Sequence, residues 1–233
     1  MISHKHKVIF VHIPKCAGSS IEVYFGVKPF KWTEPNYENL TGWCPKRKIH
    51  LHHATATQLL ELELVSQEIW DSYYKFSIVR NPWSRAVSDY YWINGNTPFR
   101  ISFKNYLEAK GRKRNILRDS SVKEYRGDHL LSQNEFIYID DKLVVDQIIR
   151  LENLKTDFKE FAAKQGLTQS KLPHDKKAKK VYEHYSHFYQ DKEIKWVEEK
   201  YKKDIELFNY SFDDRRDQLS FFERQTNYLT RRF

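Results

Sequence analysis

The strongest constraint on this chain is a strand that runs directly into a turn of small residues. Residues 8–11 are Val-Ile-Phe-Val, a continuous apolar run typical of a strand covered on both faces, as in a parallel sheet. Pro14 cannot donate to a strand ladder, so the strand must end before it. Gly18 lets the backbone approach a ligand closely. The stretch predicts an α/β fold with a functional turn after its first long strand.

A helix is predicted directly after this turn. Ser19 followed by Glu22 is a capping-box signal, and it favours a helix over residues 19–25 with Gly26 after its end. A strand that ends at a helix N-terminus presents backbone N–H groups to an anion, and Lys15 adds a positive charge there. The stretch therefore predicts a phosphate-binding loop. The plainer interpretation is a strand-to-helix turn with a solvated Lys15.

The loop does not follow the common nucleotide-binding pattern. In the Walker pattern a Lys follows the second Gly and precedes a Ser or Thr that holds magnesium. Here Lys15 comes three residues before Gly18, and no Gly opens the loop. A kinase or ATPase of that type is disfavoured.

A second strand, predicted over residues 73–79, also delivers a positive side chain to the start of a helix. Arg80 follows this strand, and Asn81 with Pro82 is a strong helix start because Asn caps well and Pro suits the first helical position. Ser88 lies two turns along that helix. A guanidinium beside a hydroxyl suits a terminal phosphate, since the guanidinium donates twice in a fork.

The same helix offers a structural pair. Arg85 and Asp89 are four residues apart, so we expect a salt bridge between them.

Three histidines lie between the two strands, at positions 50, 52 and 53. If the segment is extended, His50 and His52 share one face and His53 points the other way. No Cys, Asp or Glu stands beside them in the sequence, so the ligand count argues against a metal. A histidine at the helix entrance formed by Thr55 is well suited to act as a general base, because its pKa lies near neutrality. For His50 we favour a buried ring satisfied by a backbone carbonyl.

The remaining elements are predicted from apolar periodicity and turn residues. Residues 28–48 lack a period and read as a long aromatic loop, a candidate flap over an acceptor. Further segments are expected as a helix from 56 to about 65, a helix over 102–110, strands over 134–139 and 143–151, a helix from 154 that stops at Gly166, and a helix stripe over 194–208.

Composition narrows the class of protein. The 233 residues suffice for one domain over residues 1–233, and 40 Lys and Arg against 31 Asp and Glu give a formal charge of +9. This charge favours an anionic partner or simply a basic surface. Two cysteines give no disulfide framework, and no apolar run is long enough for a transmembrane segment. With no signal peptide before the first strand, we expect a cytoplasmic protein.

Together these stretches resemble a known family. His12 to Ser20 resembles the 5′-phosphosulfate loop of sulfotransferases that use 3′-phosphoadenylyl sulfate (PAPS), and Arg80 to Ser88 looks like their 3′-phosphate site. Residues 52–56 lie where the carbohydrate branch (heparan/chondroitin-type, sulfotransferase family 2) keeps its catalytic histidine. Residues 150–154 and 172–174 also resemble that branch. The resemblance runs in order from about residue 7 to residue 212 and implies a P-loop-like sulfotransferase fold, with a central mostly parallel sheet flanked by helices.

The resemblance also implies residue roles. Lys15 would neutralise charge on the departing phosphate, and His53 would take the proton from the acceptor hydroxyl, with His52 the second choice. Arg80 and Ser88 would hold the 3′-phosphate. The 5′-phosphate would be held by backbone N–H groups and hydroxyls of Ala17, Gly18, Ser19 and Ser20. No metal is required if Lys15 does the neutralising.

The chain departs from the family pattern in two places. Cys16 and Ala17 stand where relatives usually carry Thr or a second Gly, and the thiol of Cys16 leads us to expect a loop sensitive to oxidation. After residue 174 a lysine-rich run replaces the expected Asn or Ser, and Lys177 is a candidate contact to the 3′-phosphate or part of a solvated run.

The sequence thus predicts an enzyme that transfers a sulfuryl group from PAPS to a hydroxyl, most simply on a carbohydrate. The alternatives are a non-catalytic nucleotide-, anion- or nucleic-acid-binding protein that retains the loops, and a phosphoryl transferase. Specific nucleic-acid binding is not expected, because clustered aromatic and basic readout motifs are absent. The sequence leaves the oligomeric state open.

Overall fold

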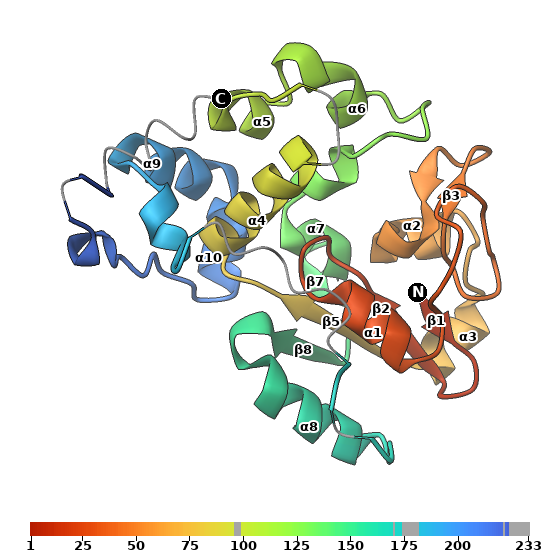
Figure 1. The fold of residues 1–233 in the computed structure, drawn as a ribbon. Coiled ribbons are helices and arrows are strands. Elements are labelled where there is room, and N and C mark those ends of the chain that lie inside the picture. Colours follow the sequence, from red (N-terminus) through yellow and green to blue (C-terminus); the bar gives the residue numbers. More distant parts are fainter. Residues whose placement is uncertain (96–98, 170, 174–181, 221, 224–233) are drawn as a thin grey trace.

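A computed structural model describes residues 1–95, 99–169, 171–173, 182–220 and 222–223. Its centre is a four-stranded sheet in the order β1-β2-β5-β8 (Figure 1). Strands β2 (Val8–Val11), β5 (Tyr74–Val79) and β8 (Gln147–Arg150) are parallel, while β1 (Ile2–Ser3) pairs antiparallel with β2. The prediction of a central mostly parallel sheet flanked by helices is confirmed.

The two strands that the sequence singled out are adjacent. Phe10 of β2 pairs with Phe76 of β5, and all four residues of β2 are buried. Because parallel neighbours end at the same edge of a sheet, the turns that follow β2 and β5 lie side by side. This edge is where the sequence placed both phosphate-binding stretches.

Three helices follow the parallel strands directly or through one turn. They are α1 (Gly18–Tyr24) after β2, α4 (Pro82–Gly95) after β5, and α8 (Leu154–Lys164) after β8. Figure 1 shows β5 running straight into α4, with α5 and α6 beyond it and α9 and α10 beside it. The predicted stop of α8 at Gly166 is confirmed by the positive φ of 62° at that residue.

Buried apolar side chains form two clusters. The first surrounds the sheet, where the rings of Phe76 and Phe161 lie 4.3 Å apart. The second joins α4 to the helices beyond the sheet and is rich in aromatic rings, among them Tyr90 and Phe188. The remaining helices are α2 (Ala56–Glu61), α3 (Gln67–Ser72), α5 (Phe103–Leu107), α6 (Arg114–Arg118), α7 (Gln133–Ile137), α9 (Asp191–Lys200) and α10 (Lys202–Leu207).

Two short hairpins stand apart from the main sheet. Strand β3 (Trp43–Cys44) pairs with β4 (Ile49–His50), so the predicted long loop over residues 28–48 contains a strand near its end. Strand β6 (Tyr138–Ile139) pairs with β7 (Lys142–Leu143) across Asp140 and Asp141, which both have positive φ.

Four predicted boundaries were wrong. The strand expected over 143–151 is limited to β8 (Gln147–Arg150), and Leu143 belongs to the hairpin strand β7. Residues 134–139 are mostly helix α7, because Ser132 and Glu135 form a capping box that favours helix over strand. The helix after Thr55 ends at Glu61, and the stripe over 194–208 is two helices that meet at Tyr201. None of the helices that the structure describes has the length and apolar character needed to cross a bilayer.

Candidate active site

The turn between β2 and α1 leaves backbone donors open. Lys15 and Ala17 have φ of 69° and 59°, and Ala17 caps α1 without any side-chain hydrogen bond. Within the described residues, the N–H groups of Ala17, Gly18 and Ser19 take part in no hydrogen bond. Successive unpaired N–H groups of this kind form a concave anion site. The predicted phosphate loop therefore has suitable local geometry.

The predicted capping box at Ser19 is wrong. Glu22 is buried and lies 3.1 Å from Nδ1 of His12, so its carboxylate orients that ring and does not cap the helix. The His12 ring in turn covers Gly18, where an added Cβ would lie 1.8 Å from His12 Nε2. Gly18 is needed because the imidazole packs directly on its Cα.

The turn between β5 and α4 is built differently, because the chain itself uses its donors. The Asn81 side chain accepts hydrogen bonds from the N–H groups of Trp83 and Ser84, which confirms it as the helix cap. The N–H of Asn81 donates to Glu152 at 2.7 Å, and the N–H of Arg80 donates to the Gln133 side chain at 2.8 Å. A ligand at this turn would therefore meet side chains and few free backbone N–H donors.

Arg80 joins the two turns. Its NH1 donates to the carbonyl of Lys15 at 3.2 Å, and its Nε donates to the Ser84 hydroxyl at 2.9 Å. Lys15 and Arg80 are therefore neighbours, as the sequence predicted. Ser88 lies one helical turn beyond Ser84 and is half-buried.

The expected salt bridge between Arg85 and Asp89 is not formed. Arg85 is buried and donates to the carbonyls of Pro14, His129 and Leu131. Asp89 accepts hydrogen bonds from His129 and Tyr106 instead. Arg85 thus holds the start of the phosphate loop against a distant segment.

Cys16 is not an exposed reactive thiol. Burial raises the pKa of this thiol to about 12, and its Sγ lies 3.6 Å from the Gln133 side chain. Because the thiolate is the reactive form, the expected sensitivity to oxidation is contradicted.

The histidines near position 50 do not lie on a strand. Strand β4 ends at His50, and Leu51–His53 form a 3₁₀ helix that brings the His52 and His53 rings within 4.2 Å of each other. The predicted alternation of faces is therefore wrong. His50 is buried, and its Nε2 lies 3.2 Å from the Tyr125 carbonyl, as favoured, but also 2.8 Å from NH1 of Arg126.

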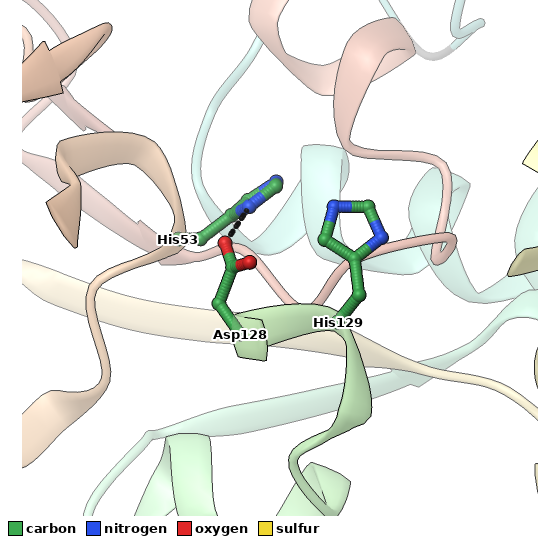
Figure 2. Close-up of side chains that lie close together, drawn as sticks. All are labelled: His53, Asp128 and His129. Atoms are coloured by element: carbon green, nitrogen blue, oxygen red, sulfur yellow. Dashed lines mark hydrogen bonds and ion pairs between the residues drawn. The ribbon is translucent and has the colours of Figure 1, made fainter. Parts of the chain in front are cut away.

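His53 is held by a carboxylate that the sequence did not reveal. Its Nδ1 lies 2.5 Å from Oδ2 of Asp128, which stands 75 residues later in the 3₁₀ helix Gly127–Leu130 (Figure 2). Burial, and next the nearby His12, lower the pKa of His53 well below its usual value of 6.5. A neutral ring that donates from Nδ1 keeps an unprotonated Nε2, which is the form a general base requires.

His52 is held in the opposite way. Its Nδ1 accepts a hydrogen bond from the N–H of Gly42 at 3.3 Å. Burial, and next the nearby His53, lower the pKa of His52, so the neutral ring carries its proton on Nε2. The two rings therefore differ in which nitrogen is able to accept a proton.

A chain of aromatic contacts connects His53 to the predicted phosphate loop. The ring centroids of His53 and His12 lie 4.8 Å apart, and those of His53 and His129 lie 5.1 Å apart. His129 stacks on Trp92, and Nζ of Lys15 lies 5.4 Å from the centre of the Trp92 ring. Lys15 and His53 thus border one region. Lys177 lies outside the described residues.

Comparison with known proteins agrees with this arrangement. No curated protein and no solved structure gives a significant match. A model of the sulfotransferase family matches residues 1–211 of the 233. The chain therefore belongs to the sulfotransferase family, in the family 2 division that the motifs indicated, and is a transferase of sulfuryl groups.

Proposed function

We propose that this protein transfers a sulfuryl group from PAPS to a hydroxyl of a carbohydrate. Family membership supports sulfuryl transfer in general. The donor and the acceptor are inferred from how the two turns and the histidines lie around one edge of the sheet.

The 5′-phosphate of the donor would lie in the turn between β2 and α1. The unpaired N–H groups of Ala17, Gly18 and Ser19 supply donors, and the half-buried hydroxyls of Ser19 and Ser20 add two more. Lys15 supplies the charge that stabilises the departing phosphate. Neutral donors position the group, while the lysine acts on the charge that develops during transfer.

The 3′-phosphate would lie at the turn between β5 and α4. Arg80 supplies the guanidinium from the turn, and Ser88 supplies a hydroxyl from the helix α4 that follows. Because Arg80 also bonds the Lys15 carbonyl, it both binds the donor and fixes the loop that holds the other phosphate. The distance of 3.2 Å between these groups supports one nucleotide that reaches both turns.

His53 would act as the general base. The acceptor oxygen attacks sulfur, its proton passes to Nε2 of His53, and the bond from sulfur to the bridging oxygen breaks. The products are the sulfate ester, adenosine 3′,5′-bisphosphate and a proton held by the imidazole. Asp128 is a positioning residue, because it accepts a hydrogen bond from Nδ1–H and stabilises the imidazolium that forms.

The acceptor side is suggested by Trp32 and Arg126. Trp32 is 45% exposed in the loop over residues 28–48, and the Arg126 guanidinium lies 5.4 Å from its ring. The same guanidinium lies 5.6 Å from Trp92. Aromatic faces beside a guanidinium can contact both the apolar and the polar sides of a sugar.

The single observation that carries the proposal is the position of His53, whose ring contacts His12 beside the predicted phosphate loop and whose Nδ1 faces Asp128. A thermal-shift titration with adenosine 3′,5′-bisphosphate and with ADP tests the donor, because a bound ligand raises apparent stability by mass action. We expect the bisphosphate to give the larger shift, and then PAPS-dependent sulfation of a carbohydrate panel. Equal shifts together with steeply salt-dependent nucleic-acid binding would instead indicate the non-catalytic alternative.

A further inference from the structure

His53 is one of several histidines whose ring is oriented by a carboxylate at Nδ1. His53 Nδ1 lies 2.5 Å from Asp128, and His129 Nδ1 lies 2.6 Å from Asp89. In metal centres the ligating histidine almost always donates its other nitrogen to a carboxylate or carbonyl, which fixes the ring and raises its basicity. His129 with Asp89 is such a pair, and its ring centroid lies 5.1 Å from that of His53.

Asp128 supplies a third donor. One ligand atom from each of His53, Asp128 and His129 lies within 4.8 Å of the others. Figure 2 shows the Asp128 carboxylate directed at His53, with the His129 imidazole beside them on the segment that also carries Asp128. The Oδ2 atom of Asp128 bonds His53, whereas its Oδ1 is buried and has no hydrogen-bond partner in the described part of the chain. An unpaired buried carboxylate oxygen is costly unless a proton donor or a cation meets it.

From this geometry we propose that His53, His129 and Asp128 bind a late first-row divalent metal ion such as Zn²⁺, and that the bound ion inhibits transfer. Two imidazoles and a carboxylate are a donor set that suits zinc and leave a fourth position open. Tetrahedral zinc ligands lie about 3.3 Å apart at bond lengths of about 2.0 Å, so binding must draw these donors together. The half-buried His53 is the side chain placed to move.

Inhibition follows from the same atoms. Coordination through Nδ1 of His53, the nitrogen that faces Asp128, would leave the ring proton on Nε2, so Nε2 could no longer take the acceptor proton. This part of the inference rests on the proposed function, whereas metal binding itself does not. His12 does not join the set, because Gly18 covers its Nε2.

The site is tested on chelator-treated full-length protein with Zn²⁺ by calorimetry and with Co²⁺ by visible absorption. We expect one equivalent to bind with d–d bands of a four- or five-coordinate ion. The affinity should fall at least about 10-fold in His129→Gln and in His53→Ala, and about 10- to 100-fold in Asp89→Asn, which removes an outer carboxylate. The exposed His4 offers the matched control His4→Ala, expected to bind like the wild type. Circular dichroism and the thermal shift with bisphosphate confirm that each variant is folded.

Each result has a defined meaning. Unchanged heats and spectra in folded His129→Gln and His53→Ala would overturn the site. If Zn²⁺ binds through these residues but leaves sulfation at the same rate, the inhibitory role is refuted. If Zn²⁺ binds through them and no sulfation occurs with or without chelator, the metal site stands and the proposed function fails.

Discussion

The turns after β2 and β5 occupy neighbouring positions in one sheet, yet they are stabilised in opposite ways. After β5, Asn81 caps the helix and distant side chains bond the backbone donors of the turn. After β2, no side chain caps α1, and the N–H groups of Ala17 to Ser19 have no partner in the described residues. A capping side chain pairs with the free N–H groups at a helix N-terminus, whereas an N-terminus without a cap leaves these groups for a bound anion.

The comparison teaches where each phosphate contact comes from. On the proposed function, the first turn would bind with its backbone and would therefore depend on loop shape. The second would bind with the side chains of Arg80 and Ser88, before and on a helix that already has its cap. We therefore expect loss of the Asn81 cap at the second turn to lower stability, and loss of a hydroxyl at the first turn to lower affinity.

The largest effect on turnover is expected at His53, whose ring contacts His12 just before the first turn. His53→Ala should lower turnover by about 10²- to 10⁴-fold, and Asp128→Asn by about 10²-fold, because both remove an oriented, unprotonated Nε2. Bisphosphate affinity, measured by calorimetry, should stay within about twofold, since neither side chain lies in the turn. A structural role for Asp128 alone would instead lower unfolding temperature and affinity together, with an unchanged pH profile of turnover.

Gly18→Ala should damage the first turn. The new Cβ would overlap His12, which is buried between Glu22 and the loop, so we expect about 1–3 kcal/mol of destabilisation and at least about 10-fold weaker bisphosphate binding. Gly95→Ala is the matched control, because a Cβ there meets no atom of the described residues within 4 Å. Urea denaturation and calorimetry on both variants make the test, and equal behaviour would mean that His12 does not constrain the loop.

Asn81→Ala and Ser20→Ala should give crossed effects. Asn81→Ala removes a cap and should cost about 1 kcal/mol of stability with little change in bisphosphate affinity. Ser20→Ala removes a ligand hydroxyl and should weaken the bisphosphate several-fold, with stability changed by less than about 0.5 kcal/mol. Denaturant titration measures the stability, and calorimetry measures the bisphosphate affinity. If both variants lost stability only, or both lost affinity only, the contrast between the turns would be refuted.

The smallest effect is a pH dependence of stability. Burial, in spite of Asp128, lowers the pKa of His50 to about 4, and His52 and His53 are lowered in the same direction. The folded protein then binds fewer protons than the unfolded chain at acidic pH. These histidines therefore contribute their full stabilisation above about pH 6.5, and the contribution falls as the pH drops toward 4. Unfolding midpoints at pH 7.5 and pH 5 should show the decline, and His50→Gln should reduce it. A midpoint independent of pH in the wild type would contradict buried neutral rings.

Local signals were sufficient for much of this fold. The apolar runs of β2 and β5, the caps at Asn81 and Thr55, and the stop at Gly166 are properties of a few adjacent residues, and the structure has each of them. The strand predicted over 134–139 failed because the capping box at Ser132 outweighs the apolar run that follows.

The candidate site needed information that short stretches do not hold. Lys15, Arg80 and His53 follow recognisable motifs. Asp128 was missed because it stands 75 residues from His53, in a basic segment with no motif of its own. The ligand count made from the sequence considered only residues close to His53 along the chain, so it did not include Asp128 or His129. Arg85 likewise found carbonyls of distant segments in place of its helical neighbour.

The central claim is that one doubly phosphorylated nucleotide contacts both turns. It is tested most directly by calorimetric affinities for adenosine 3′,5′-bisphosphate and for AMP, in the wild type and in Ser88→Ala. We expect the wild type to bind the bisphosphate at least about 10-fold more tightly than AMP, and Ser88→Ala to lose part of that preference while AMP affinity stays the same. Equal affinities for the two nucleotides in the wild type would contradict the account.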